Sequence, residues 1–387
     1  MTNKKDSKKN DFQKIVNRLH SGSKLNHPFE SKDGTYRSEL EDRLNNFNGR
    51  LKKLSENDLK SSDYLSLKLP DFERTKNQIL KVVDTYLSGS IGSAYDEFEK
   101  LTEITIIKDS IPLLTESLDD FKHKEYKSLY RIRTSEKYIA DREDIFHIPF
   151  EHRHLVSSQR FSISGLPSLY LGSSLYACWQ EMGRPDFNKV YVSRYQVDDS
   201  RGRDVKVLNL AYSLELLKKS LLEKLFDFSS DLDSDDVNNA YIALFPLVMA
   251  CSFTRKHDSS MFNEEYILPN LLLQWTSRNA HEICGIKYLS SKTRHVRNHE
   301  VGFNYVFPPQ SKGVMESGHC PELKSIFKLT RPVSWQLMDT LNEKSNSDSF
   351  TWSHNEDLDE QFVKSYKKTK FFNFESKLGE IPEMSID

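Results

Sequence analysis

Glycine is scarce in this chain, with 14 glycines among 387 residues. Neither a P-loop sequence (GxxxxGKS or GxxxxGKT) nor a GxGxxG sequence after a strand is present. Because both loops need glycine to bring backbone close to phosphate, the sequence excludes the common nucleotide-binding loops. The sequences GxSxG and HExxH are also absent, which excludes a nucleophile elbow and a zincin site.

Cysteine, long apolar runs and excess charge are lacking too. The four cysteines are scattered with no CxxC spacing, which favours reduced thiols over disulfides or a zinc site. No run approaches the roughly 18 apolar residues that span a membrane, and the N-terminus lacks the apolar stretch of a signal peptide. With 55 basic and 57 acidic residues, the net charge is -2, so the chain has no overall basic character that would favour nucleic acid, although local basic clusters remain open. We expect a cytoplasmic globular protein that binds neither nucleic acid nor membrane, and the composition leaves its oligomeric state open.

The periodicity of apolar residues predicts an α+β protein with a helical N-terminal region. Leu40, Leu44, Phe47 and Leu51 are spaced as one face of a helix, and Pro70–Leu87 repeats this pattern, with Pro70 in a first turn. A further helix is expected with Ser93 as its N-cap. We therefore predict a helical accessory region at 1–120, a mixed α+β domain at 121–335 and a polar tail at 336–387.

The mixed domain is expected to alternate short strands with covering helices. Strand patterns occur at Ser128–Arg133, Lys189–Val197, Val205–Leu210, Ile283–Leu289, Val301–Phe307 and Leu323–Val333. Helix patterns occur at Ser213–Phe228, Asp236–Phe253 and Glu264–Arg278. In the tail, the aromatic patch Phe371–Phe374 either docks on the domain or is loosely ordered.

The stretch from Gln159 to Met182, QRFSISGLPSLYLGSSLYACWQEM, concentrates groups that can carry chemistry. It offers Arg160, a strand with Tyr170, a Gly-Ser-Ser break and a mostly apolar helix that ends at Glu181. Each of these side chains also has an ordinary explanation. An arginine commonly pairs with a structural carboxylate, a strand tyrosine is commonly half-buried, and a helix glutamate is commonly solvated.

Two residues outside this stretch complete the candidate set. Arg131 lies on an otherwise apolar strand, where a guanidinium needs an anionic partner, either a carboxylate of the protein or a bound phosphate. Ser290 follows the strand GIKYL, where its hydroxyl can meet a ligand or cap the next turn. His152 and His154 form a His-x-His pair, but no third metal ligand is evident, so no metal site is predicted.

Several of these elements occur in the order of a known family, and the chain resembles the RES-domain proteins. The matching positions are Leu129–Ile132, Arg160-Phe161, Gly165, Leu169–Leu171, Ala177, Glu181, Tyr266–Pro269, Gly285–Ser290 and Val301–Phe307. The resemblance spans about Leu129 to Phe307 and rests on the order of its parts, because no single motif is decisive. Leu289 departs from the proline that is common there, and the region from Asp199 to Phe262 is longer than in compact members.

The resemblance implies a function and a fold. Many RES-domain proteins are toxins of toxin–antitoxin pairs that degrade NAD, and their fold is similar to that of ADP-ribosyltransferase toxins. It implies that Glu181 acts at the nicotinamide–ribose bond, that Tyr170 lies at the nicotinamide, that Arg131 and Arg160 bind the phosphates, and that Ser290 donates to a ribose, a phosphate or the nucleophile. NAD is then a substrate rather than a recycled cofactor, and the acceptor is either water or inorganic phosphate.

Two other functions remain open at this stage. The same fold can transfer ADP-ribose to a macromolecule, or the chain can be a non-catalytic protein whose N-terminal helices bind a partner. A small protein antitoxin or another regulator is the partner that the resemblance implies.

Overall fold

The computed structural model describes a large part of the chain. The described residues are 15–19, 25, 28–30, 34–56, 62–118, 128–198, 200, 205–211, 234–257, 260–279, 282–292, 300–310, 314–340 and 365–386. The helix predicted at Ser213–Phe228 lies outside them. The chain forms two compact units: unit 1 contains residues 1–115, 158–163 and 208–275, and unit 2 contains residues 116–157, 164–207 and 276–387. The boundaries 1–120, 121–335 and 336–387 expected from the sequence stay a prediction.

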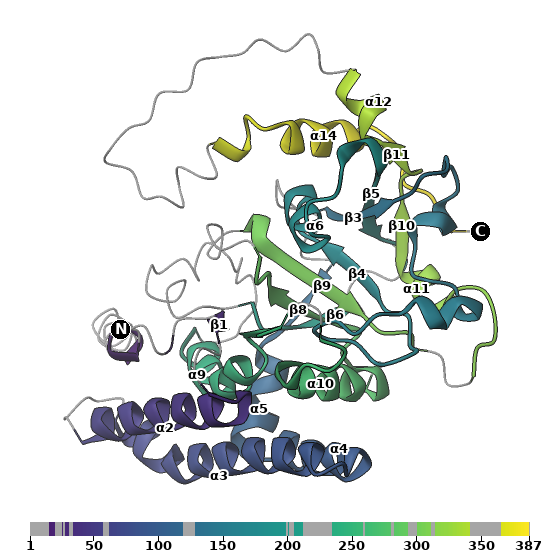
Figure 1. Cartoon of the computed structure of the whole chain (residues 1–387). Coiled ribbons are helices and arrows are strands. Elements are labelled where there is room, and N and C mark those ends of the chain that lie inside the picture. The colour runs from purple at the N-terminus through teal and green to yellow at the C-terminus, as the bar shows by residue number, and fades with distance from the viewer. Residues whose placement is uncertain are drawn as a thin grey trace. The chain divides into compact units, whose positions relative to one another are not determined.

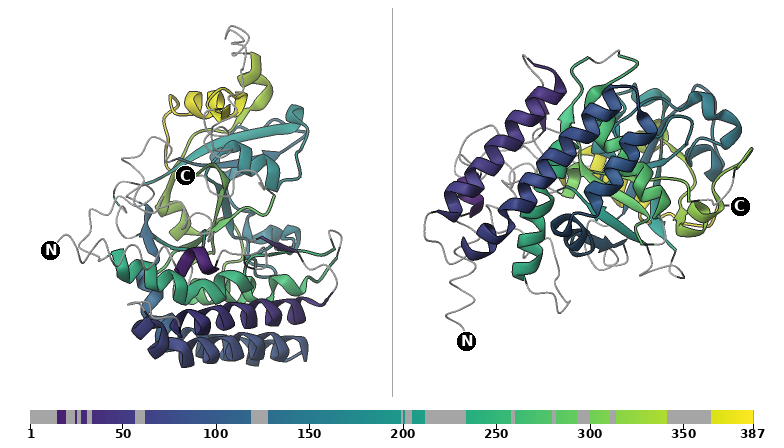
Figure 2. Two further views of the ribbon diagram at one scale, coloured as in Figure 1. Left: turned by 90° about the vertical axis from the view of Figure 1, so that its left-hand side faces the viewer. Right: turned by 90° about the horizontal axis from the view of Figure 1, so that it is seen from below.

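Unit 1 is built from packed helices. They are α2 (Tyr36–Ser55), α3 (Ser62–Leu87), α4 (Ile91–Thr102), α5 (Thr105–Leu113) and α9 (Ser234–Ala250). Figures 1 and 2 show α2, α3 and α9 running side by side. Leu40, Leu44, Phe47 and Leu51 of α2 are buried, as their spacing predicts. A short parallel pair, β1 (Phe29–Glu30) with β7 (Phe253–Thr254), completes the unit.

Two helix boundaries differ from the sequence prediction. Helix α3 begins at Ser62, so Pro70 lies inside the helix rather than in its first turn. A proline removes one backbone hydrogen bond, and the packing of α3 on α2 and α4 outweighs that loss. Helix α4 begins at Ile91, so Ser90 rather than Ser93 holds the N-cap position.

Unit 2 contains most of a mixed sheet (Figure 1). Its strands are β2 (Thr115–Ser117), β3 (Leu129–Thr134), β4 (Leu169–Gly172), β5 (Val190–Val197), β6 (Lys206–Asn209), β8 (Gly285–Leu289), β9 (Phe303–Phe307), β10 (Phe327–Leu329) and β11 (Val333–Ser334). The strand order is β10-β5-β3-β4-β9-β8-β6-β2, and β11 also pairs with β5. Along the segment β5-β3-β4-β9-β8, each strand pairs antiparallel with the next. The α+β class predicted from the sequence is confirmed.

Short helices accompany this sheet. They are α6 (Leu175–Glu181), α11 (Pro321–Ile326), α12 (Trp335–Thr340) and α14 (Lys370–Leu378), and α10 (Ile267–Arg278) crosses the boundary between the units. The single strand predicted at Leu323–Val333 is wrong, because Pro321 opens α11 at a first helical position and only two short strands follow. No described helix is both long and apolar enough to cross a membrane.

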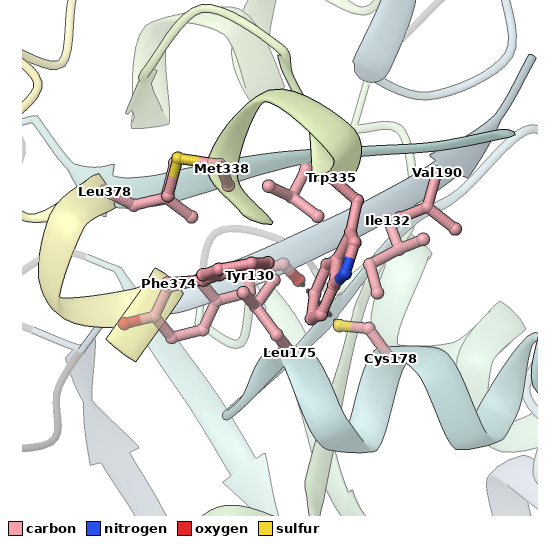
Figure 3. Packing of buried hydrophobic residues seen from close by; sticks show 10 residues of the cluster. Tyr130, Ile132, Leu175, Cys178, Val190, Trp335, Met338, Phe374 and Leu378 are labelled. Atoms are coloured by element: carbon pink, nitrogen blue, oxygen red, sulfur yellow. Dashed lines mark hydrogen bonds between the residues drawn. The ribbon is translucent and has the colours of Figure 1, made fainter. Parts of the chain in front are cut away.

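One hydrophobic cluster of unit 2 joins the C-terminal segment to the sheet. Figure 3 shows Leu175 of α6, Trp335 of α12 and Phe374 of α14 converging over Tyr130 and Ile132 of β3. The ring centroids of Trp335 and Phe374 are 4.2 Å apart. The aromatic patch Phe371–Phe374 therefore docks on the domain, which was one of the two alternatives left open by the sequence.

Candidate active site

Glu181 is the last residue of α6, the short helix that follows β4 directly. Ser174 is the N-cap of α6, where its hydroxyl accepts a hydrogen bond from the Ala177 N–H at 2.9 Å. The same hydroxyl donates to the Val301 carbonyl at 2.6 Å, next to β9. Gly172 lets the helix fold back closely, because a Cβ there would lie 2.6 Å from the Cys178 sulfur. The Gly-Ser-Ser break thus fixes α6 against the strands.

The carboxylate of Glu181 accepts two hydrogen bonds on one oxygen. The Ser290 hydroxyl donates to Glu181 Oε1 at 2.5 Å, and the Asn304 amide donates to the same atom at 2.8 Å. Strand β8 ends just before Ser290, and Asn304 lies on β9. These two strands pair antiparallel, with Leu289 opposite Phe303, and so bring both donors to the end of α6. We call Glu181, Ser290 and Asn304 the carboxylate triad.

The Ser290 and Asn304 side chains are buried, so they hold the Glu181 carboxylate in one orientation. Ser290 is 1% exposed and Asn304 is 5% exposed, whereas Glu181 is partly exposed. Among the described residues, both donors bind Oε1 and no hydrogen bond is made to Oε2. Such an arrangement suits a carboxylate that accepts a substrate hydroxyl or faces developing positive charge.

Lys292 adds a cation near this carboxylate. Its ammonium group donates to the Glu181 backbone carbonyl at 3.3 Å, and its backbone N–H donates to the Ser290 hydroxyl at 3.2 Å. The turn after β8 is thereby tied to the end of α6.

Arg131 and Tyr170 are brought together on neighbouring strands. Arg131 Nη1 donates to the Tyr170 backbone carbonyl at 2.8 Å, whereas the buried Nε has no partner among the described residues. Burial lowers the pKa of the Arg131 guanidinium and raises the pKa of the Tyr170 phenol. Because strand side chains alternate, Arg131 points to the face of β3 opposite Tyr130 and Ile132, which pack against α6. Among the described residues, Arg131 makes no hydrogen bond to Glu181 or Ser290.

Arg160 belongs to unit 1, whereas the other four predicted site residues belong to unit 2. Its guanidinium carbon lies 6.0 Å from the centroid of the Phe161 ring. Phe161 is buried and has a φ of 60°, an uncommon backbone conformation for a residue with a bulky side chain.

Sequence reasoning selected Glu181 and Ser290 but missed Asn304. The signal was an amide inside the otherwise apolar strand FNYVF, because a buried amide requires a polar partner. The partner of the Asn304 amide depends on the register of β9 with its neighbouring strands. The residues around Asn304 in the sequence do not determine that register.

The two histidines considered for a metal lie on the surface of unit 2. The rings of His152 and His154 are exposed, and their centroids are 6.0 Å apart. Among the described residues, no group of three metal-ligating side chains is present.

Comparison with known proteins gives one informative relative. The chain is 35% identical over 286 residues to a Bacillus subtilis (strain 168) protein named "Putative toxin YopC". The aligned region covers 73% of this chain and 63% of the relative, so this chain matches less than two thirds of that protein's length. No protein-family model and no solved structure matches the chain.

Proposed function

We propose that the chain is an NAD-degrading enzyme of the RES type that cleaves the bond between nicotinamide and ribose. The carboxylate triad carries this proposal, because two buried donors hold one oxygen of a partly exposed carboxylate at the position that the resemblance assigns to catalysis. An arrangement of the sheet like that of ADP-ribosyltransferases is part of the same proposal.

The chemistry explains why a single carboxylate suffices. The nicotinamide ring of NAD is positively charged and becomes neutral when its bond to ribose breaks, so the leaving group needs no general acid. The ribose carbon develops positive charge in an oxocarbenium-like transition state. Water then adds to give ADP-ribose, nicotinamide and a proton, or inorganic phosphate adds to give ADP-ribose phosphate and nicotinamide.

Each candidate residue has a role in this scheme. Glu181 Oε2 accepts a ribose hydroxyl and stabilises the positive charge, while Ser290 and Asn304 hold Oε1. Tyr170 lies at the nicotinamide. Arg131 binds a phosphate group, because its buried Nε has no partner among the described residues and can donate to an anion. Its side chain leaves β3 on the face away from α6. The role of Arg160 as a second phosphate-binding cation stays a prediction of the sequence resemblance.

We further propose that NAD loss makes the protein a toxin or a defence effector that acts in the cytoplasm. The name of the Bacillus subtilis relative supports a toxic role. A small protein that blocks the site is the regulator expected for such an enzyme.

The first test measures nicotinamide release from NAD by the purified full chain, with and without inorganic phosphate. Glu181→Gln keeps the size of the side chain but removes its charge, so kcat should fall by about 10²- to 10³-fold. Glu136→Gln is a matched control, because Glu136 is an exposed acid of the same unit that pairs with Lys189. Its kcat should equal that of the wild type.

Three outcomes would contradict the proposal. Absence of nicotinamide release under both conditions rejects NAD cleavage. Transfer of label from NAD to a protein or nucleic acid, with little free ADP-ribose, identifies a macromolecular transferase instead. Equal activity of Glu181→Gln and wild type excludes Glu181 as the catalytic carboxylate.

A further inference from the structure

A second carboxylate, Glu375, contacts the helix that carries Glu181. Glu375 lies on α14 and is 8% exposed. Its Oε1 accepts a hydrogen bond from the Leu175 backbone N–H at 2.7 Å, across 200 residues of sequence. Leu175 is the first residue of α6, and Glu181 is its last.

Helix α6 depends on such contacts because it is only seven residues long. The first backbone N–H groups of any helix have no partner within the helix and must be satisfied from outside. Ser174 satisfies the N–H of Ala177, and Glu375 satisfies the N–H of Leu175. An isolated helix of this length would be unstable, so its position is set by the groups that hold it.

Glu375 is itself held in place by a second donor. The Tyr366 hydroxyl donates to the same oxygen, Oε1, at 2.5 Å, and Tyr366 is 3% exposed. Around them, Phe374 and Leu378 of α14 pack with Leu175 and Cys178 of α6 (Figure 3). Both sides of this contact are therefore enclosed by packed side chains.

The carboxylate at this position carries a cost that a purely structural residue would avoid. Among the described residues, no cation forms an ion pair with Glu375, and burial raises its pKa to about 7. A leucine would fill the same apolar cluster without this cost, but it could not accept the Leu175 N–H. The hydrogen bond to the Leu175 N–H is therefore the best explanation for a carboxylate at position 375.

We propose that Glu375 is a positioning residue for the proposed reaction: through the Leu175 N–H it fixes α6, and thereby the carboxylate of Glu181. This inference rests on the proposed function for its link to catalysis. The C-terminal helix then completes the active site without contacting the substrate.

Three variants separate positioning from general stability. Glu375→Gln keeps an oxygen acceptor for both donors, Glu375→Leu removes it, and Glu375→Asp keeps the charge but shortens the reach. Ser376→Ala is the matched control on the same helix, because Ser376 is exposed and its hydroxyl donates to the Phe372 carbonyl within α14. Nicotinamide release is measured as kcat and KM, and hydrogen exchange is measured at the amides of residues 175–181.

We expect kcat of Glu375→Leu and Glu375→Asp to fall by about 10- to 100-fold with KM little changed, because a small displacement of a catalytic group has that effect. The amides of α6 should exchange faster in both variants. Glu375→Gln and Ser376→Ala should resemble the wild type in both measurements. If Glu375→Leu does not fold, the comparison of Glu375→Asp with Glu375→Gln makes the same test.

The result that overturns the inference is unchanged kcat and unchanged exchange at α6 in Glu375→Asp and Glu375→Leu. Equal loss of kcat in Glu375→Gln and Glu375→Leu also overturns it, because the acceptor would then not matter. If the wild type releases no nicotinamide, the proposed function fails. The exchange of α6 amides alone then decides whether Glu375 positions this helix.

Discussion

At the scale of single residues, Glu181 and Glu375 of unit 2 differ in how far their carboxyl groups are exposed. Glu181 is partly exposed and accepts from two neutral donors, whereas Glu375 is enclosed by aromatic and aliphatic side chains. The first arrangement keeps a carboxylate oriented and accessible. The second uses a carboxyl group as an internal acceptor.

Asn304 offers a test of how strongly the orientation of Glu181 matters. Replacing Asn304 with Ala removes one hydrogen bond to Glu181 Oε1, so kcat should fall by about 10- to 100-fold, as expected for a hydrogen bond to a charged group of about 1.5–3 kcal/mol. Asn304→Asp should lower kcat further than Asn304→Ala, because it removes the amide donor and places a second negative charge beside Glu181. Steady-state measurements of nicotinamide release check this, and an Asn304→Asp kcat equal to that of the wild type contradicts it.

The residues of the triad were only partly predictable from sequence. Glu181 and Ser290 stand at the ends of regular elements, where their local patterns favour ordinary structural roles, and only the resemblance to RES-domain proteins selects them. Asn304 is 123 residues from Glu181, and Glu375 is 200 residues from Leu175. Their partners depend on strand register and on the docking of a distant helix, and neither is encoded locally.

At the scale of elements, local patterns identified where helices and strands exist better than where they begin or end. The apolar stripe of α2 and the alternation of β3 and β5 were strong enough to be read directly. Pro70 and the segment at Leu323–Val333 were misread because packing overrode a local signal in α3, and a proline opened a short helix in α11.

The contact between α14 and α6 predicts how stability depends on pH. The pKa of Glu375 is raised to about 7 in the folded protein, from an ordinary value near 4.5. The resulting stabilisation is fully present below pH 4.5 and is lost as pH rises through 7. The free energy of unfolding should therefore fall by about 3 kcal/mol from this group, at about 1.4 kcal/mol per pKa unit.

Denaturant titrations of the wild type and Glu375→Gln between pH 5 and pH 8 measure this contribution, because glutamine does not titrate. The difference between the two free energies of unfolding should change across this range. A constant difference would show that Glu375 titrates at its ordinary pKa in the folded protein.

At the scale of the whole molecule, the two compact units do not follow the order of the chain. Unit 1 takes residues 158–163 and 208–275 in addition to its N-terminal part, and unit 2 takes the segments between and after them. A change in composition along the sequence can mark a boundary between two domains. It cannot show that a segment after that boundary packs with residues before it, so the assignment of 158–163 and 208–275 to unit 1 was not predictable.

The proposed function predicts a specific effect in cells. Induced expression of the wild type should stop growth, and cellular NAD should fall before growth stops, whereas expression of Glu181→Gln at the same level should do neither. Total NAD and optical density measured over the same time course check the order of events. Growth arrest with normal NAD would place the target elsewhere.

The hydrogen bond from the Leu175 N–H to Glu375 also has a consequence for how the protein is made. A ribosome must add 200 residues beyond Leu175 before Glu375 exists to hold that helix. On the role proposed for Glu375, the carboxylate of Glu181 emerges early in synthesis but acquires its final position late. Chains interrupted before α14 lack the Glu375 acceptor, so we expect them to release nicotinamide more slowly than the full chain, as Glu375→Leu should.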